Sequence, residues 1–128
     1  MSAVVREWLV KADADYATAR REMTTPETRN YDAVCFHAQQ CAEKLLKGLL
    51  IQSGVMPPKL HDLVQLDRLV RAVLPEWSWP VEELRLLTRA AVDFRYPGED
   101  ADLPEASAAF DVCTRLRSAI LPLFGPAT

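Results

Sequence analysis

The chain has 128 residues, of which 49 % are hydrophobic and 26 % are charged, and this length and composition are typical of one domain spanning residues 1–128. The formal net charge of −3 excludes a protein that binds nucleic acid over its whole surface, because such proteins carry a basic excess. Binding of RNA would therefore require a local basic patch or a partner protein.

Hydrophobic residues recur at intervals of three and four in five segments, as they do along one face of an α-helix. The stretches between them, such as GVMPPKLHD and PEWSWP, are rich in residues that favour turns. No segment convincingly favours a strand. The expected helices span approximately residues 2–23, 30–53, 61–74, 81–94 and 103–124. Five helices joined by short or medium loops predict an all-α fold, an antiparallel up-and-down helical bundle.

Residues typical of helix ends mark several of these boundaries. Gly54 follows the second helix, where glycine commonly forms the C-terminal cap. Pro80 lies at or near the first position of the fourth helix, and Asp102 with Pro104 marks the start of the fifth.

The second expected helix has a well-defined apolar arc at 100° per residue. Its small members, Ala38 and Ala42, and the nearby Gly48 would let another helix approach closely, including one from a second subunit. The arc consists of Val34, Ala38, Cys41, Ala42, Leu45 and Leu49.

A polar ridge follows the same helix beside this arc. His37, Gln40 and Lys44 are spaced i, i+3 and i+7, so their side chains lie in one row. An imidazole, an amide and an ammonium in line can hold a phosphate or an acidic partner. The alternative is a solvated helix face on which Glu43 pairs with Lys47. An overlapping ridge is formed by Phe36, Gln40, Lys44 and Lys47.

Two further clusters allow a binding or a structural interpretation. Lys59, His61 and Asp62 lie where a loop enters the third helix, and either they bind an anion with the free backbone N–H groups or they cap the helix. Arg95 and Tyr96 lie at the end of the fourth helix, where they either contact a ligand or complete the helix end and cover the core.

Neither a leader, a membrane span nor a metal site is expected. The beginning, MSAVVREWLVKADADY, lacks a basic segment followed by a long apolar run, and no run of about 18 apolar residues occurs, so we expect a cytoplasmic protein. Cys35, Cys41 and Cys113 form no CxxC pair and are expected to be reduced thiols. His37 and Cys41 are spaced i, i+4, but no second ligand pair accompanies them. The phosphate-binding GxxxxGK[ST] and GxGxxG motifs and the GxSxG nucleophile motif are also absent.

The string YDAVCFHAQQCAEKLLKGLLIQSGVMPPKLHDLVQL, followed by RYPG, resembles the HEPN family over about residues 3–122. The resemblance implies a bundle of four long helices and one shorter helix. It also implies a homodimer that often pairs with a minimal nucleotidyltransferase as a toxin–antitoxin-like module. The residues at motif positions are His37, Gln40, Glu43, Lys44, Lys47, His61, Asp62, Arg95, Tyr96 and Pro97.

The resemblance favours a binding module for a nucleotide, a nucleotidyltransferase partner or both, with no cofactor other than a bound nucleotide. Some family members are metal-independent ribonucleases with an Arg and a His separated by four to six residues. This sequence lacks that spacing, which favours a protein without catalytic activity. The alternative is a ribonuclease in which Arg95 acts with His37 or His61 across a dimer.

Overall fold

The computed structural model describes residues 1–25, 27, 30–94 and 96–125. Within these ranges the chain forms five α-helices, one short 3-10 helix and no strand, which confirms the all-α prediction. The fifth helix ends at Ile120, earlier than expected, because Pro122 lacks the backbone N–H that an α-helix needs. The bounds are α1 Ala3–Thr24, α2 Tyr31–Gln52, α3 Leu63–Val73, α4 Val81–Asp93, α5 Leu103–Ile120 and η1 Leu121–Leu123.

The caps confirm the predicted end of α2 and the predicted start of α5. Asp102 and Glu105 form a reciprocal capping box at the start of α5. The Asp62 side chain accepts a hydrogen bond from the backbone N–H of Val64 and so caps α3. Gly54, directly after the α2 cap residue, has φ +82°, a conformation that glycine adopts without strain.

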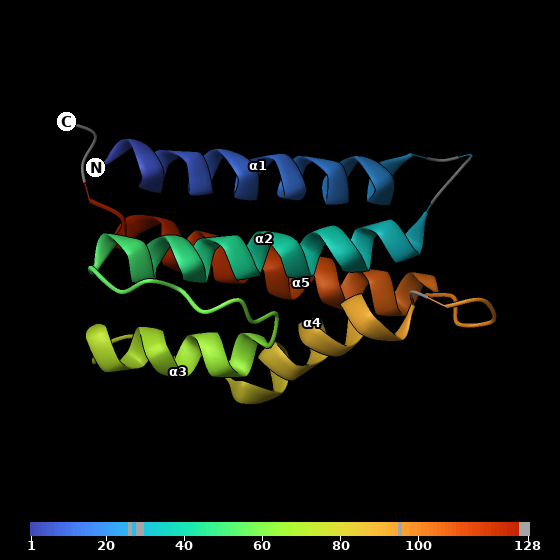
Figure 1. Cartoon of the computed structure of the whole chain (residues 1–128). Coiled ribbons are helices and arrows are strands. Elements are labelled where there is room, and N and C mark those ends of the chain that lie inside the picture. The colour runs from blue at the N-terminus through green and yellow to red at the C-terminus, as the bar shows by residue number, and fades with distance from the viewer. Residues whose placement is uncertain (26, 28–29, 95, 126–128) are drawn as a thin grey trace.

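Helix α2 is the central element of the bundle. Figure 1 shows α1 on one side of α2, α3 and α4 on the other, and α5 packed against α2 as well. The segment 53–62 runs back along α2, so that α3 starts beside the middle of α2 and runs in the same direction. The simple up-and-down alternation therefore fails at this one connection. Three helices are long and two are short, where the resemblance implied four and one.

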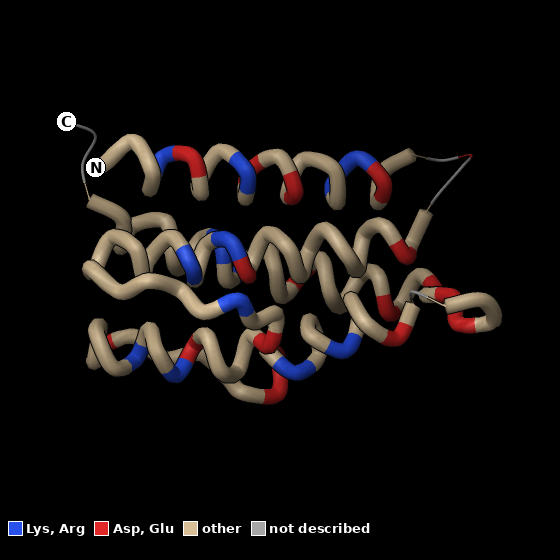
Figure 2. Tube along the Cα trace, in the orientation of Figure 1, with Lys and Arg blue, Asp and Glu red and all other residues tan. Residues whose placement is uncertain are grey.

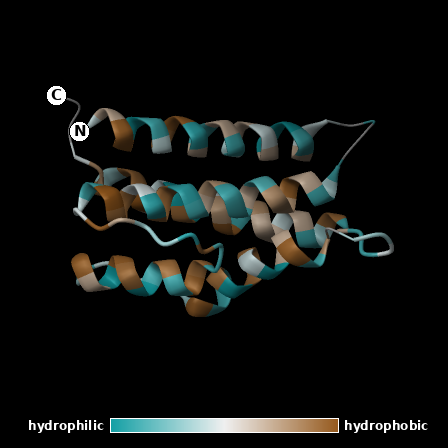
Figure 3. Ribbon diagram, in the orientation of Figure 1, coloured by the Kyte–Doolittle hydropathy of each residue, from teal (hydrophilic) through white to brown (hydrophobic). Residues whose placement is uncertain are grey.

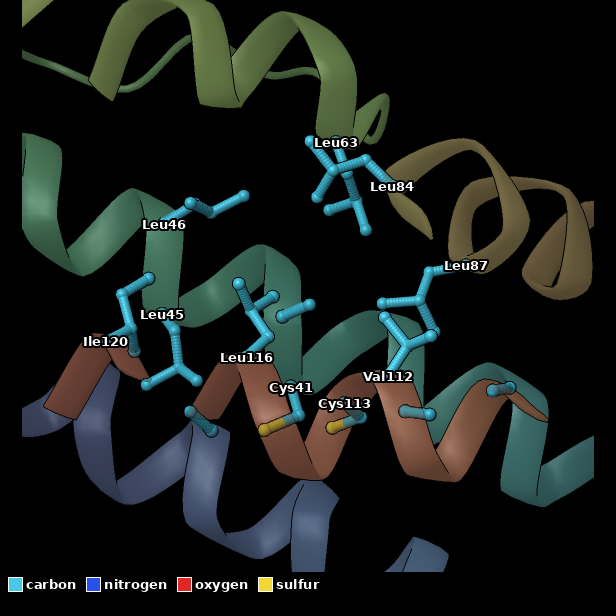
Figure 4. Close-up of a cluster of buried hydrophobic side chains, with 14 of the residues drawn as sticks. Cys41, Leu45, Leu46, Leu63, Leu84, Leu87, Val112, Cys113, Leu116 and Ile120 are labelled. Carbon is cyan, nitrogen blue, oxygen red and sulfur yellow. The ribbon is translucent and has the colours of Figure 1, made fainter. Parts of the chain in front are cut away.

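The core forms where the apolar faces of these helices meet. Every residue of the predicted α2 arc is buried, and Figure 4 shows Cys41 and Leu45 facing Leu116 and Ile120 of α5. In Figure 3 the helices carry both hydrophobic and hydrophilic stretches, as expected when each packs through one face. No helix within the described ranges is long and apolar enough to span a membrane.

The small residues of α2 do allow a close approach, and the chain itself makes it. A Cβ atom on Gly48 would lie 3.2 Å from two ring atoms of Phe124 and 3.5 Å from the Cβ of Trp8. This part of α2 is therefore covered by α1 and by the segment after α5. It does not present a free groove to a second subunit.

Candidate functional site

Two of the three residues of the predicted polar ridge contact a buried carboxylate on α1. Asp15 is only 8 % exposed, and its two oxygens bind the Nδ1 of His37 at 2.8 Å and the Nζ of Lys44 at 2.5 Å. Asp15 lies on the inward stripe of α1 between the buried residues Ala12 and Ala19. The contacts of His37 and Lys44 with Asp15 therefore join α2 to α1, and the charge of Lys44 is compensated within the chain.

A second carboxylate, Glu43, is the centre of a larger network on α2. It is 4 % exposed and accepts hydrogen bonds from Gln39 Nε2 at 3.0 Å, Gln40 Nε2 at 3.4 Å and Lys47 Nζ at 3.0 Å. The Nδ1 of His61 lies 3.0 Å from the same carboxylate. The predicted Glu43–Lys47 pair thus exists. The alternative in which this pair lies on a solvated face is wrong, because both side chains are buried.

The network sets the ionisation of Glu43. Burial raises the pKa of a carboxyl group and is the largest single influence on it. Hydrogen bonds from Gln39, Lys47 and His61 together outweigh burial and hold the pKa of Glu43 below its usual value. The carboxylate is therefore charged at neutral pH and can orient the imidazole that it contacts.

Both histidines share one arrangement. His37 and His61 each direct Nδ1 at a buried carboxylate, so the Nδ1–H tautomer is favoured and Nε2 is left to face outwards. Within the described ranges neither Nε2 atom has a hydrogen-bond partner. The side chain of His61 is 79 % exposed, whereas that of His37 is 29 % exposed. His61 is thus the more accessible oriented imidazole.

His61 borders a cleft of about 430 Å³ between α2, α4 and the start of α3. Phe36, 39 % exposed, forms one wall and also borders a smaller hollow of about 320 Å³ that contains His37. Both apolar and polar side chains line the larger cleft, so it offers a ligand packing surface as well as hydrogen-bonding groups. Its lining residues are Phe36, Gln39, Gln40, His61, Asp62, Thr88, Ala91 and Val92.

The remaining predicted site residues are distributed differently. Lys59 and Tyr96 are exposed but do not line this cleft, and Lys47 is buried against Glu43. The prediction for Arg95 lies outside the described residues. The sequence did not predict the part of the cleft that α4 contributes, which consists of Thr88, Ala91 and Val92. The i, i+3 spacing of Thr88 and Ala91 is visible in the sequence, but it indicates a site only once the packing of α4 on α2 is known.

The cysteines contribute no reactive site. All three are free and buried. Burial, with smaller effects from nearby carboxylates, raises the pKa of Cys35 to about 12, and a hydrogen bond with Cys113 together with burial raises the pKa of the Cys41 thiol. Among the residues that the structure describes, no group of three or more His, Cys, Asp or Glu side chains is placed to hold a metal ion.

The described residues thus form a five-helix bundle in which buried carboxylates hold two histidines, His37 on α2 and His61 just before α3. The sequence matches the HEPN domain family over residues 5–122, and the chain belongs to this family. The fold is similar to the crystal structure of TT1696 from Thermus thermophilus, with a TM-score of 0.73 and 24 % identity over 94 % of this chain and 98 % of that one. It is also similar to ST0689, an archaeal HEPN homologue, with a TM-score of 0.67 and 23 % identity over 93 % and 96 % of the two chains. No curated protein matches the sequence significantly.

Proposed function

We propose that this HEPN domain is a homodimeric binding module that holds a nucleotide in the cleft beside Phe36 and His61. Its protein partner in this proposal is a minimal nucleotidyltransferase, as in a toxin–antitoxin-like pair. The observation that carries the proposal is the fixed orientation of His61. Buried Glu43 holds one ring nitrogen, and the other is open at a cleft large enough for a small ligand.

The chemistry of the cleft suits a nucleotide. The exposed ring of Phe36 offers a stacking surface for a base, and such stacking is tolerant of base identity. The Nε2 of His61 and the amide of Gln40 can hydrogen-bond polar edges of the ligand. The Glu43 carboxylate behind both groups is already engaged by them, so it fixes the His61 Nε2 and the Gln40 amide oxygen as acceptors for N–H groups of a base.

Replacement of Phe36 by alanine is expected to weaken nucleotide binding about tenfold, since stacking on an aromatic side chain contributes about 1–3 kcal/mol per base. Calorimetric titration of the purified protein with the four nucleoside triphosphates measures this. Val10→Ala, on an exposed position of α1, is the matched control and should bind like the wild type. Equal affinities of the wild type and Phe36→Ala for nucleotide would contradict the placement of the base in this cleft.

Native mass spectrometry of the protein purified from its host would identify a dimer, a bound nucleotide and a second protein.

The carboxylate–imidazole pair also favours a second candidate, a ribonuclease. An imidazole held by a carboxylate can act as a general base, and its Nε2 faces solvent at His61. Arg95 from a second subunit would supply the charge that stabilises the phosphate. If this candidate is right, the protein cleaves a mixed RNA pool in EDTA and His61→Gln abolishes cleavage. Cleavage that survives both His37→Ala and His61→Ala would contradict this mechanism.

A further inference from the structure

A second hollow of about 380 Å³ adjoins the cleft beside His61. The two share Asp62 and Thr88 as lining residues, so they lie next to each other at the start of α3 and the flank of α4. Three guanidinium groups line this second hollow, which we call the arginine groove: Arg68 of α3 and Arg85 and Arg89 of α4. Figure 2 shows Lys and Arg positions in blue along α3 and α4, the two helices that lie on the side of α2 away from α1.

The positive charge of the arginine groove is largely uncompensated. Arg68 and Arg89 are exposed and form no ion pair within the described residues. Arg85 pairs with Glu82 at 2.7 Å, but both side chains are more than half exposed, so this pair is weak and exchanges readily. Asp62, at the shared wall, is occupied in capping α3. A chain with a net charge of −3 thus retains the local basic patch that binding of a phosphorylated ligand requires.

We infer that the arginine groove binds the phosphate chain of a nucleoside triphosphate whose base lies in the cleft beside Phe36. This inference rests on the proposed function and extends it to the class of ligand. The guanidinium group of arginine presents a planar fork of donors that matches two phosphate oxygens. Three such groups on two helices can contact several linked phosphates at once, so they suit a triphosphate better than a monophosphate. Thr88 lies on the wall common to both hollows, where the sugar passes from one to the other.

The inference is tested by titrating the full-length protein with each nucleoside, its monophosphate and its triphosphate, and with inorganic tripolyphosphate. The test variant is Arg68→Gln with Arg89→Gln. The matched control is Arg20→Gln with Arg21→Gln, which removes the same charge from exposed positions of α1. The expected result is that affinity rises from nucleoside to triphosphate. The groove variant should lose about tenfold or more for triphosphate and tripolyphosphate, while its affinity for the nucleoside and that of the control stay unchanged.

The possible failures are distinguishable. Full triphosphate affinity in the groove variant, with loss in Phe36→Ala, would overturn the inference and leave the proposed function intact. Binding of tripolyphosphate without any nucleoside or nucleotide selectivity would support the groove and contradict the nucleotide function. An equal loss of triphosphate affinity in the control variant would indicate that the phosphates bind at the α1 surface, and it would overturn the inference. Poly-glutamate is titrated in parallel, and a groove variant that loses poly-glutamate binding but keeps its triphosphate affinity would make the groove a contact for an acidic protein, which also overturns the inference.

Discussion

Replacement of Glu43 by alanine is expected to destabilise the protein by about 3–5 kcal/mol, because removal of one member of a buried ion pair leaves the other charge without a partner. Lys47 is 7 % exposed, and its ammonium group contacts Glu43 at 3.0 Å. The same substitution removes the acceptor that orients His61. Urea unfolding followed by circular dichroism measures the free energy of unfolding at pH 7.

Glu82→Ala is the matched control, because Glu82 also pairs with a cation but is exposed. We expect it to change the free energy of unfolding by less than about 1 kcal/mol. A loss as small for Glu43→Ala would show that the buried network contributes nothing to stability. A smaller loss for Glu43→Gln is expected, since the amide oxygen still accepts hydrogen bonds.

The lowered pKa of Glu43 also predicts the direction of a pH effect. A carboxyl group whose pKa is depressed on folding contributes stability that is fully present above its unfolded pKa, which is near 4.5. That contribution is lost as the pH falls through the lower pKa of the folded state. The difference in stability between the wild type and Glu43→Gln should therefore shrink below about pH 4.5. A difference that stays constant to lower pH would contradict the assigned ionisation.

The helices and the apolar arc of α2 were predictable, because helical periodicity and end caps are local properties of the sequence. The burial and the partners of the polar residues on α2 were not predictable, because these partners lie 18–29 positions away in the sequence. The pairs His61–Glu43 and Lys44–Asp15 are examples. Asp15 could have been recognised from its position on the inward stripe of α1, where a lone carboxylate requires a partner. The Glu43–Lys47 spacing predicted the contact but not its burial.

The arginine groove shows the same limit. The spacing of Arg85 and Arg89 by four residues places both on one face of α4 and is visible in the sequence. The approach of Arg68 from α3 depends on how the two helices pack, and that packing is fixed by the segment between them. The part of this segment after the expected third helix, residues 75–80, was predicted only as a turn-rich connection.

Its packing is governed by a buried network around Asp67. The Asp67 carboxylate is 2 % exposed and accepts hydrogen bonds from Trp77 Nε1 and Arg71 Nε, both at 2.7 Å. Arg71 also donates to the carbonyl oxygen of Trp79 at 2.7 Å, and the two indole rings stack with centroids 5.8 Å apart. One carboxylate on α3 thus fixes the path of the chain into α4.

Replacement of Asp67 by alanine is expected to destabilise the protein by about 2–4 kcal/mol, because the indole N–H of Trp77 and the guanidinium of Arg71 lose their acceptor together. Tryptophan fluorescence during urea unfolding reports on the change directly. Asp111→Ala, which breaks an exposed pair with Arg115, is the control and should alter stability by less than about 1 kcal/mol.

The Asp67 substitution also tests whether the relative position of the three arginines matters for phosphate binding in the arginine groove. Asp67 does not line the groove, yet it holds α3 and α4 in the relative position that brings Arg68 beside Arg89. Triphosphate affinity should therefore fall in Asp67→Ala even under conditions where the variant remains folded, while nucleoside affinity is affected less. Unchanged triphosphate affinity in the folded variant would mean that the three arginines do not act as one site.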